Sequence, residues 1–96
     1  MDNGELIELQ RIIKEGGPEA EDAARRFYDE IKDTIKRMLR SISYKYSKEY
    51  LDWGINEAFL AFRYNWDPER GMSFKGYLWK YVKERVRTAI AKDRGK

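Results

Sequence analysis

The stretch that decides the fold is Asn65-Trp-Asp-Pro-Glu-Arg-Gly-Met-Ser-Phe-Lys-Gly-Tyr-Leu-Trp-Lys-Tyr-Val82, where a tight turn precedes a segment that alternates lysines with large aromatics. Pro68 presets a turn, and Gly71 is free to take a left-handed backbone conformation. Ser73 can cap a new helix, because its side-chain oxygen can accept a hydrogen bond from an amide of the first turn. The stretch therefore predicts a turn followed by a C-terminal helix.

Three further helices are predicted upstream, where apolar residues recur every three or four positions. The first covers residues 5–15 and ends at two glycines. The second begins at Pro18 and runs to about Tyr46, and Ser47 caps the third. The expected core positions of these helices are Leu6, Leu9, Ile12, Ile13, Ala20, Ala24, Phe27, Ile31, Ile35, Met38, Leu39, Ile42, Leu51, Ile55, Ala58, Phe59 and Phe62. The pattern is typical of an all-α fold, a compact bundle of about four helices. Inside helical segments, Gly54 and Gly76 suggest close backbone contacts.

The chain of 96 residues fits a single domain. Residues 1–17 form an acidic N-terminal helix with its Gly-Gly break, and residues 18–96 form the main helical body. Cysteine and histidine do not occur, which removes disulfides, the usual zinc ligands and the commonest general base. We therefore expect no enzyme activity and no cofactor. With no long apolar run and no signal-peptide pattern at the N-terminus, we expect a cytoplasmic protein without a membrane partner.

Charge is distributed unevenly along the chain. Residues 1–34 hold ten Asp and Glu against five Lys and Arg, whereas residues 75–96 hold eight Lys and Arg against two Asp and Glu. A basic C-terminal segment indicates contact with a polyanion, and a solvated basic helix end is the alternative explanation.

The predicted C-terminal helix has two faces. Its core stripe is Phe74, Tyr77 or Leu78, Tyr81, Val82, Val86, Ala89 and Ile90, and its opposite face is Lys75, Trp79, Lys83 and Arg87 at a spacing of four. Cations neutralise phosphates and aromatic rings stack on bases, so a basic face that carries a tryptophan favours nucleic acid. Packing of Trp79 under the N-terminal helix is the alternative.

Three segments together resemble region 2 of the bacterial sigma-70 family of transcription initiation factors. They are Asn56-Glu-Ala-Phe-Leu-Ala-Phe62, Trp66-Asp-Pro-Glu-Arg-Gly-Met-Ser-Phe74, and the basic helix that contains Tyr77-Leu. The resemblance covers about residues 20–96 and implies a helical domain with two binding surfaces. One helix docks on the coiled coil of the beta-prime subunit of core RNA polymerase. The next recognises the minus-ten promoter element and captures flipped bases of the non-template strand.

The resemblance implies two sets of site residues. On the polymerase-binding helix, Asn56 and Glu57 match a Gln-Glu pair and Leu60 and Ala61 lie beside them; Asp52 is adjacent to Trp53, which stands where the family has an acidic residue. In the DNA-binding helix the matches are Tyr77, Lys80, Tyr81 and Lys83 near the melted strand and Arg87 near the upstream duplex, and Lys75 and Trp79 are added from the basic face. Two departures are a third helix about three residues shorter than in the family and Lys80-Tyr81 in place of a tryptophan pair.

Three functions remain open. The first is a sigma region 2 domain that binds core polymerase and opens the minus-ten element, with a separate protein supplying minus-thirty-five recognition and an anti-sigma factor as a further candidate partner. The second is a regulatory module that binds polymerase but does not melt promoters, which the two departures favour. The third is a helical adaptor that binds nucleic acid, or a purely structural domain, without polymerase contact.

Overall fold

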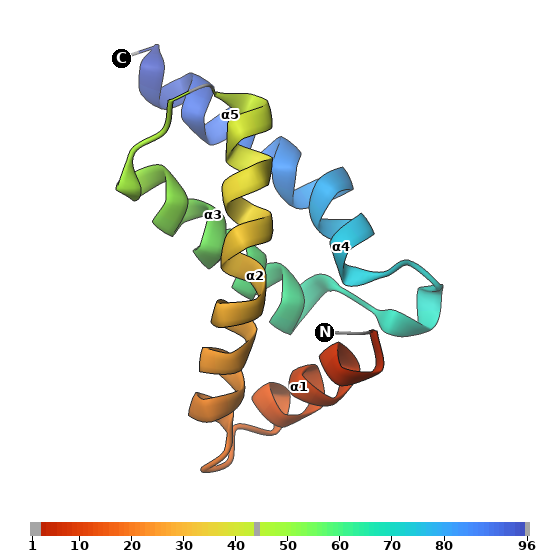
Figure 1. The fold of residues 1–96 in the computed structure, drawn as a ribbon. Coiled ribbons are helices and arrows are strands. Elements are labelled where there is room, and N and C mark those ends of the chain that lie inside the picture. Colours follow the sequence, from red (N-terminus) through yellow and green to blue (C-terminus); the bar gives the residue numbers. More distant parts are fainter. Residues whose placement is uncertain (1–2, 44, 96) are drawn as a thin grey trace.

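The protein is described by a computed structural model that covers residues 3–43 and 45–95. The helical elements are α1 (Asn3–Glu15), α2 (Ala20–Ile42), α3 (Lys48–Leu60) with a π-helical turn (Ala61–Asn65), a 3₁₀ turn (Pro68–Arg70), α4 (Phe74–Tyr77), a second π-helical turn (Leu78–Val82) and α5 (Lys83–Arg94). Because α4, the second π turn and α5 follow one another without a break, they form one rod, which we call the C-terminal helix (Figure 1). The described residues contain no strand, so the predicted all-α bundle of four helices is confirmed. The predicted outer limits of the domain, at residues 1 and 96, lie outside the described residues.

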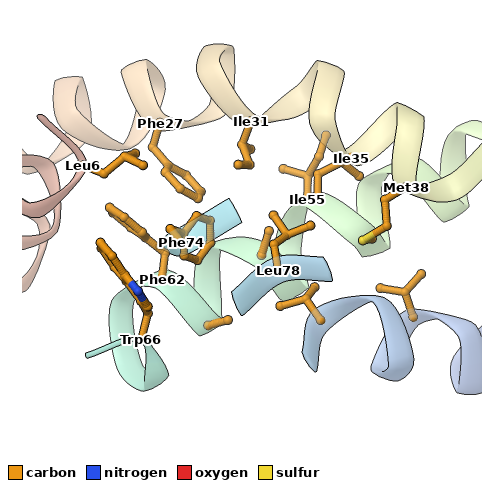
Figure 2. Close-up of a cluster of buried hydrophobic side chains, with 14 of the residues drawn as sticks. Leu6, Phe27, Ile31, Ile35, Met38, Ile55, Phe62, Trp66, Phe74 and Leu78 are labelled. Atoms are coloured by element: carbon orange, nitrogen blue, oxygen red, sulfur yellow. The ribbon is translucent and has the colours of Figure 1, made fainter. Parts of the chain in front are cut away.

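Four aromatic rings join three of the helices at the centre of the core (Figure 2). Phe27 of α2 stacks on Phe62 with ring centroids 4.3 Å apart. Phe74 meets Phe62 edge-on at 5.0 Å and Trp66 at 5.5 Å. Such pairs contribute about 0.5–1.5 kcal/mol each beyond the burial of their area. The cluster therefore holds the start of α4 firmly against α2 and the end of α3.

Helix α3 packs closely on α2 at Gly54. A Cβ atom built on Gly54 would lie 2.8 Å from Cγ2 of Ile35, which is too close for a real side chain. The predicted close contact at this glycine is confirmed. At Gly76 an added Cβ would meet the nearby Ser73 Oγ at 3.2 Å, so that crowding arises within the same helix turn.

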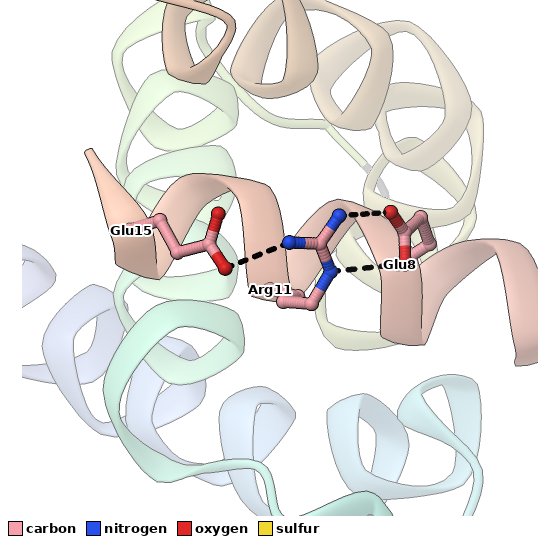
Figure 3. Close-up of polar contacts among 3 residues, drawn as sticks. All are labelled: Glu8, Arg11 and Glu15. Carbon is pink, nitrogen blue, oxygen red and sulfur yellow. Dashed lines mark hydrogen bonds and ion pairs between the residues drawn. The ribbon is translucent and has the colours of Figure 1, made fainter. Parts of the chain in front are cut away.

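Helix α1 packs on the same core through Leu6, Leu9 and Ile13, which are all buried. Its outer face is charged: Arg11 donates hydrogen bonds to Glu8 and, at 2.7 Å, to Glu15 (Figure 3). The bond from Arg11 lowers the pKa of the Glu8 carboxyl. All three side chains are well exposed, so these ion pairs add little to the stability of the fold.

The turns and caps follow the sequence predictions. Ser47 Oγ accepts a hydrogen bond from Tyr50 N at 3.2 Å, and Ser73 Oγ accepts one from Gly76 N at 3.1 Å. Gly71 has φ of 84°, in the left-handed region. None of the described helices is long and apolar enough to cross a membrane.

Helix α2 differs from the prediction at both ends. It ends at Ile42 and not near Tyr46, so the predicted end was wrong, and it begins at Ala20, two residues after Pro18. Ser43 is extended, and its hydroxyl donates to Lys45 O at 2.5 Å, a local bond that competes with helix continuation. Arg94 of α5 donates to the same hydroxyl. Tertiary contacts with the C-terminal helix thus set this boundary.

Candidate nucleic-acid interface

The second π turn exposes three consecutive side chains of the candidate DNA-binding set. Leu78 and Val82 at its ends are buried, whereas Trp79 is 39% exposed, Tyr81 is 45% exposed, and Lys80 between them is exposed as well. The prediction that Tyr81 belongs to the core was therefore wrong, as was the same prediction for Ala89, which is also exposed. The core needs only one residue from each turn of this helix.

The candidate DNA-binding residues form two rows. Tyr77 and Tyr81, four residues apart, have ring centroids 4.8 Å apart. Trp79 belongs to the row of Lys75, Lys83 and Arg87, and Lys83 Nζ lies 5.1 Å from the Trp79 ring centroid. Residues two apart on a helix do not face each other. The two rows therefore point away from one another, with Lys80 between them and its Nζ 5.4 Å from the Tyr81 ring.

Tyr77 and Tyr81 form one wall of a cavity of about 480 Å³. The opposite wall is the turn that precedes the C-terminal helix, with lining residues Asn65, Trp66, Asp67, Arg70 and Met72. Tyr77 is half-buried and its ring lies parallel to that of Phe74, at 6.5 Å, so it is a core-edge ring as predicted. Aromatic faces beside an amide, a carboxylate and a guanidinium offer both stacking and hydrogen bonds to a planar base.

Sequence reasoning missed the contribution of the turn to this cavity. Asn65, Asp67 and Arg70 were not among the predicted site residues. Their closeness to Tyr77 follows from the aromatic cluster, which pulls the start of α4 back onto the end of α3. The spacing of Trp66 and Phe74 on either side of the turn was the available signal.

The candidate polymerase-binding residues lie on α3 and at the start of the π turn that follows it. Asp52, Asn56 and Leu60 are exposed, with Leu60 at 38%. Ala61 is 1% exposed, so it packs in the core and cannot contact a partner from this position. We therefore remove Ala61 from the candidate surface. Tyr64, which the sequence did not single out, is 66% exposed on the following turn.

Glu57 lies on the side of α3 that faces α5, and its side chain is 36% exposed. Its carboxylate lies 3.8 Å from the guanidinium of Arg85. The two residues line a second cavity, of about 720 Å³, that runs between α3 and α5. Its lining residues are Trp53, Asn56, Glu57, Glu84, Arg85, Val86, Thr88 and Ala89. The α3 surface and the C-terminal helix are thus adjacent, and Glu57 with Arg85 connects them.

Among the described residues, no group of three or more His, Cys, Asp or Glu side chains could hold a metal ion. In comparisons with known proteins, no family model, no curated protein and no solved structure matches the chain. The resemblance to sigma region 2 therefore depends on the three sequence segments that carry it.

Proposed function

We propose that the chain is a sigma region 2-like domain that binds an opened promoter strand through its C-terminal helix and core RNA polymerase through α3. The observation that carries the proposal is the Tyr77–Tyr81 pair. One of its rings is 45% exposed, a lysine lies over that ring, and a cavity of about 480 Å³ opens beside both.

Opening a DNA duplex removes base stacking, which a protein must replace. An aromatic side chain contributes about 1–3 kcal/mol for each base that stacks on it. Tyr81 is available for this role because its ring is already half out of the core. Lys80 can hold the phosphate of the same nucleotide, since its ammonium lies 5.4 Å from the Tyr81 ring.

The row on the other side of the helix suits the duplex that borders the opened segment. Lys75, Lys83 and Arg87 carry cations along this row, and Trp79 is the exposed ring among them. Contacts to phosphates fix the register of a protein on DNA without reading sequence. A strand held on one side and a duplex on the other would place the helix at the junction between them.

The proposed docking surface for polymerase consists of the exposed α3 residues Asp52, Asn56 and Leu60, with the partly exposed Glu57 at the edge that faces α5. Tyr64 extends this surface in place of the buried Ala61. Exposed Tyr64 is of the residue type that most often anchors a protein interface, and Asp52 and Asn56 are polar groups of the kind found at the interface rim. Binding to core polymerase would place the protein in the cytoplasm. A separate protein for the minus-thirty-five element and an anti-sigma factor remain candidate partners.

A second function is favoured by two ion pairs. Arg85 lies 3.8 Å from Glu57, and Arg87 lies 3.0 Å from Glu84, so two of the cations of α5 are already partnered. Because these ion pairs leave fewer unpaired cations to bind DNA, they would fit a module that binds polymerase without melting promoters.

The experiment is to mix the purified chain with core polymerase and to measure co-elution and the binding of a minus-ten fork and of the matching closed duplex. Co-elution together with preference for the fork supports the sigma-like function. Co-elution without binding of the fork supports the regulatory module. Failure to co-elute refutes both.

A further inference from the structure

Gln10 is a buried amide in the apolar face of α1. It is 5% exposed and follows the core residue Leu9. Its Nε2 atom donates a hydrogen bond of 2.8 Å to Phe62 O and another of 2.7 Å to Trp66 O. Both protons of the amide are therefore used, and both partners lie more than 50 residues away in the sequence.

The two carbonyls lie where the helix formed by α3 and the first π turn ends. The last carbonyls of a helix have no hydrogen-bond donors within the helix. Leaving a buried polar group without a partner costs more than a hydrogen bond gains. Gln10 thus supplies from α1 the donors that this helix end requires. An apolar residue at position 10 would fit the apolar stripe of α1 but would leave the carbonyls of Phe62 and Trp66 without the donors that Gln10 supplies.

Trp66 extends the connection beyond the helix end. Its backbone N–H donates to Ala61 O at 2.8 Å, and its indole Nε1 donates to Met72 O at 2.9 Å. Both Trp66 and Met72 line the cavity opposite Tyr77 and Tyr81. A continuous set of hydrogen bonds therefore runs from Gln10 through Trp66 to the far end of the turn.

We propose that Gln10 is a positioning residue that holds the turn of residues 65–72 against the Tyr77–Tyr81 pair and so sets the width of the cavity between them. The consequence for ligand binding depends on the proposed function, because the ligand is an unpaired DNA strand. The positioning itself does not depend on it. The acidic helix α1, which lies outside the residues that the sequence resemblance covers, then supports the proposed DNA-binding site.

The test uses two variants of the full chain. Gln10→Met keeps the length of the side chain and removes its donors. Gln10→Glu keeps its shape but offers no donor when ionised and only one when protonated, so at least one of the two carbonyls loses its hydrogen bond. The matched control is Ile13→Val, a mild truncation of a buried residue in the same helix that leaves Gln10 in place.

Hydrogen exchange of the amides of residues 66–72 is the direct measurement. Since each hydrogen bond stabilises by a factor of about five, we expect exchange there to be roughly tenfold faster or more in Gln10→Met. With core polymerase present, affinity for an unpaired DNA oligonucleotide should fall by a similar factor, while affinity for closed duplex stays the same. Ile13→Val should change neither the local exchange nor the ratio of the two affinities.

Unchanged exchange at residues 66–72 in whichever Gln10 variants fold would overturn the positioning role. Faster exchange with an unchanged ratio of affinities would show that Gln10 only stabilises the fold, which also overturns it. If the wild-type chain binds no DNA, the proposed function fails, and the exchange measurement alone then decides whether Gln10 holds the turn. If neither variant folds, the same comparison on Gln10→Asn, whose amide is one methylene shorter, decides the question.

Discussion

Replacement of Tyr81 by alanine should separate DNA binding from folding. The ring is 45% exposed, and its nearest aromatic neighbour is Tyr77, at 4.8 Å between centroids. Full burial of a side chain of this size stabilises by about 1.5–3 kcal/mol, so removing a half-buried ring should lower the free energy of unfolding by about 1 kcal/mol. The protein should therefore stay folded at room temperature.

The loss in DNA affinity should be larger and selective. If one base stacks on Tyr81, its replacement costs about 1–3 kcal/mol, which is roughly a 5- to 150-fold weaker affinity. The loss applies to fork or single-stranded minus-ten DNA and not to closed duplex, because Lys80 and the opposite basic row remain. Fluorescence anisotropy with labelled DNA in the presence of core polymerase measures both affinities.

Tyr28→Ala is the matched control, since Tyr28 is 44% exposed but lies on α2 and does not line the cavity. It should leave both affinities unchanged. Equal losses on fork and duplex DNA for Tyr81→Ala, or the same loss for Tyr28→Ala, would refute stacking at Tyr81.

Three further predictions follow from the packing and the ion pairs. Gly54→Ala should lower the free energy of unfolding by about 1–3 kcal/mol in urea titrations, since the new methyl would lie 2.8 Å from Ile35; unchanged stability would show that the helices can move apart. Lys83→Ala should lower the salt slope of DNA binding by about one unit, whereas Arg87→Ala should lower it less because its guanidinium is paired at 3.0 Å; equal slopes would contradict that difference. Glu57→Gln should weaken co-elution with core polymerase in gel filtration, and unchanged co-elution would remove it from the docking surface.

Local features of this fold could be predicted from the sequence because their causes are local. The caps at Ser47 and Ser73 and the left-handed Gly71 each depend on residues within one turn. The end of α2 could not be predicted, because Arg94, which donates to Ser43, lies 51 residues further along the chain. A hydrogen bond between residues so far apart in the sequence does not affect the spacing of apolar residues from which the helices were predicted.

The sequence singled out the part of the candidate site that lies on the C-terminal helix, but not the turn that lines the cavity beside it. The exposed lysines and aromatics of the C-terminal helix were identified, yet their division into two rows was not, because Tyr81 was given to the core. Gln10, in contrast, is buried but was not identified as a buried residue. A single polar residue in an apolar stripe resembles a solvent-facing position, and its partners Phe62 and Trp66 are distant in the sequence.

The π turn explains why Tyr81, which was expected in the core stripe of the C-terminal helix, is exposed. Its buried residues are Phe74, Leu78, Val82, Val86 and Ile90, at a constant spacing of four. On a regular α-helix each step of four residues overshoots a full turn by about 40°, so such a row would soon leave the core. The turn from Leu78 to Val82 takes in an extra residue, with Lys83 N bonded to Leu78 O, and brings the row back. Helical turns of this kind occur often at functional sites. Here the adjustment that keeps Val82 and Val86 buried also leaves Tyr81 exposed beside its cavity, so the core packing and the proposed DNA contact have one structural cause.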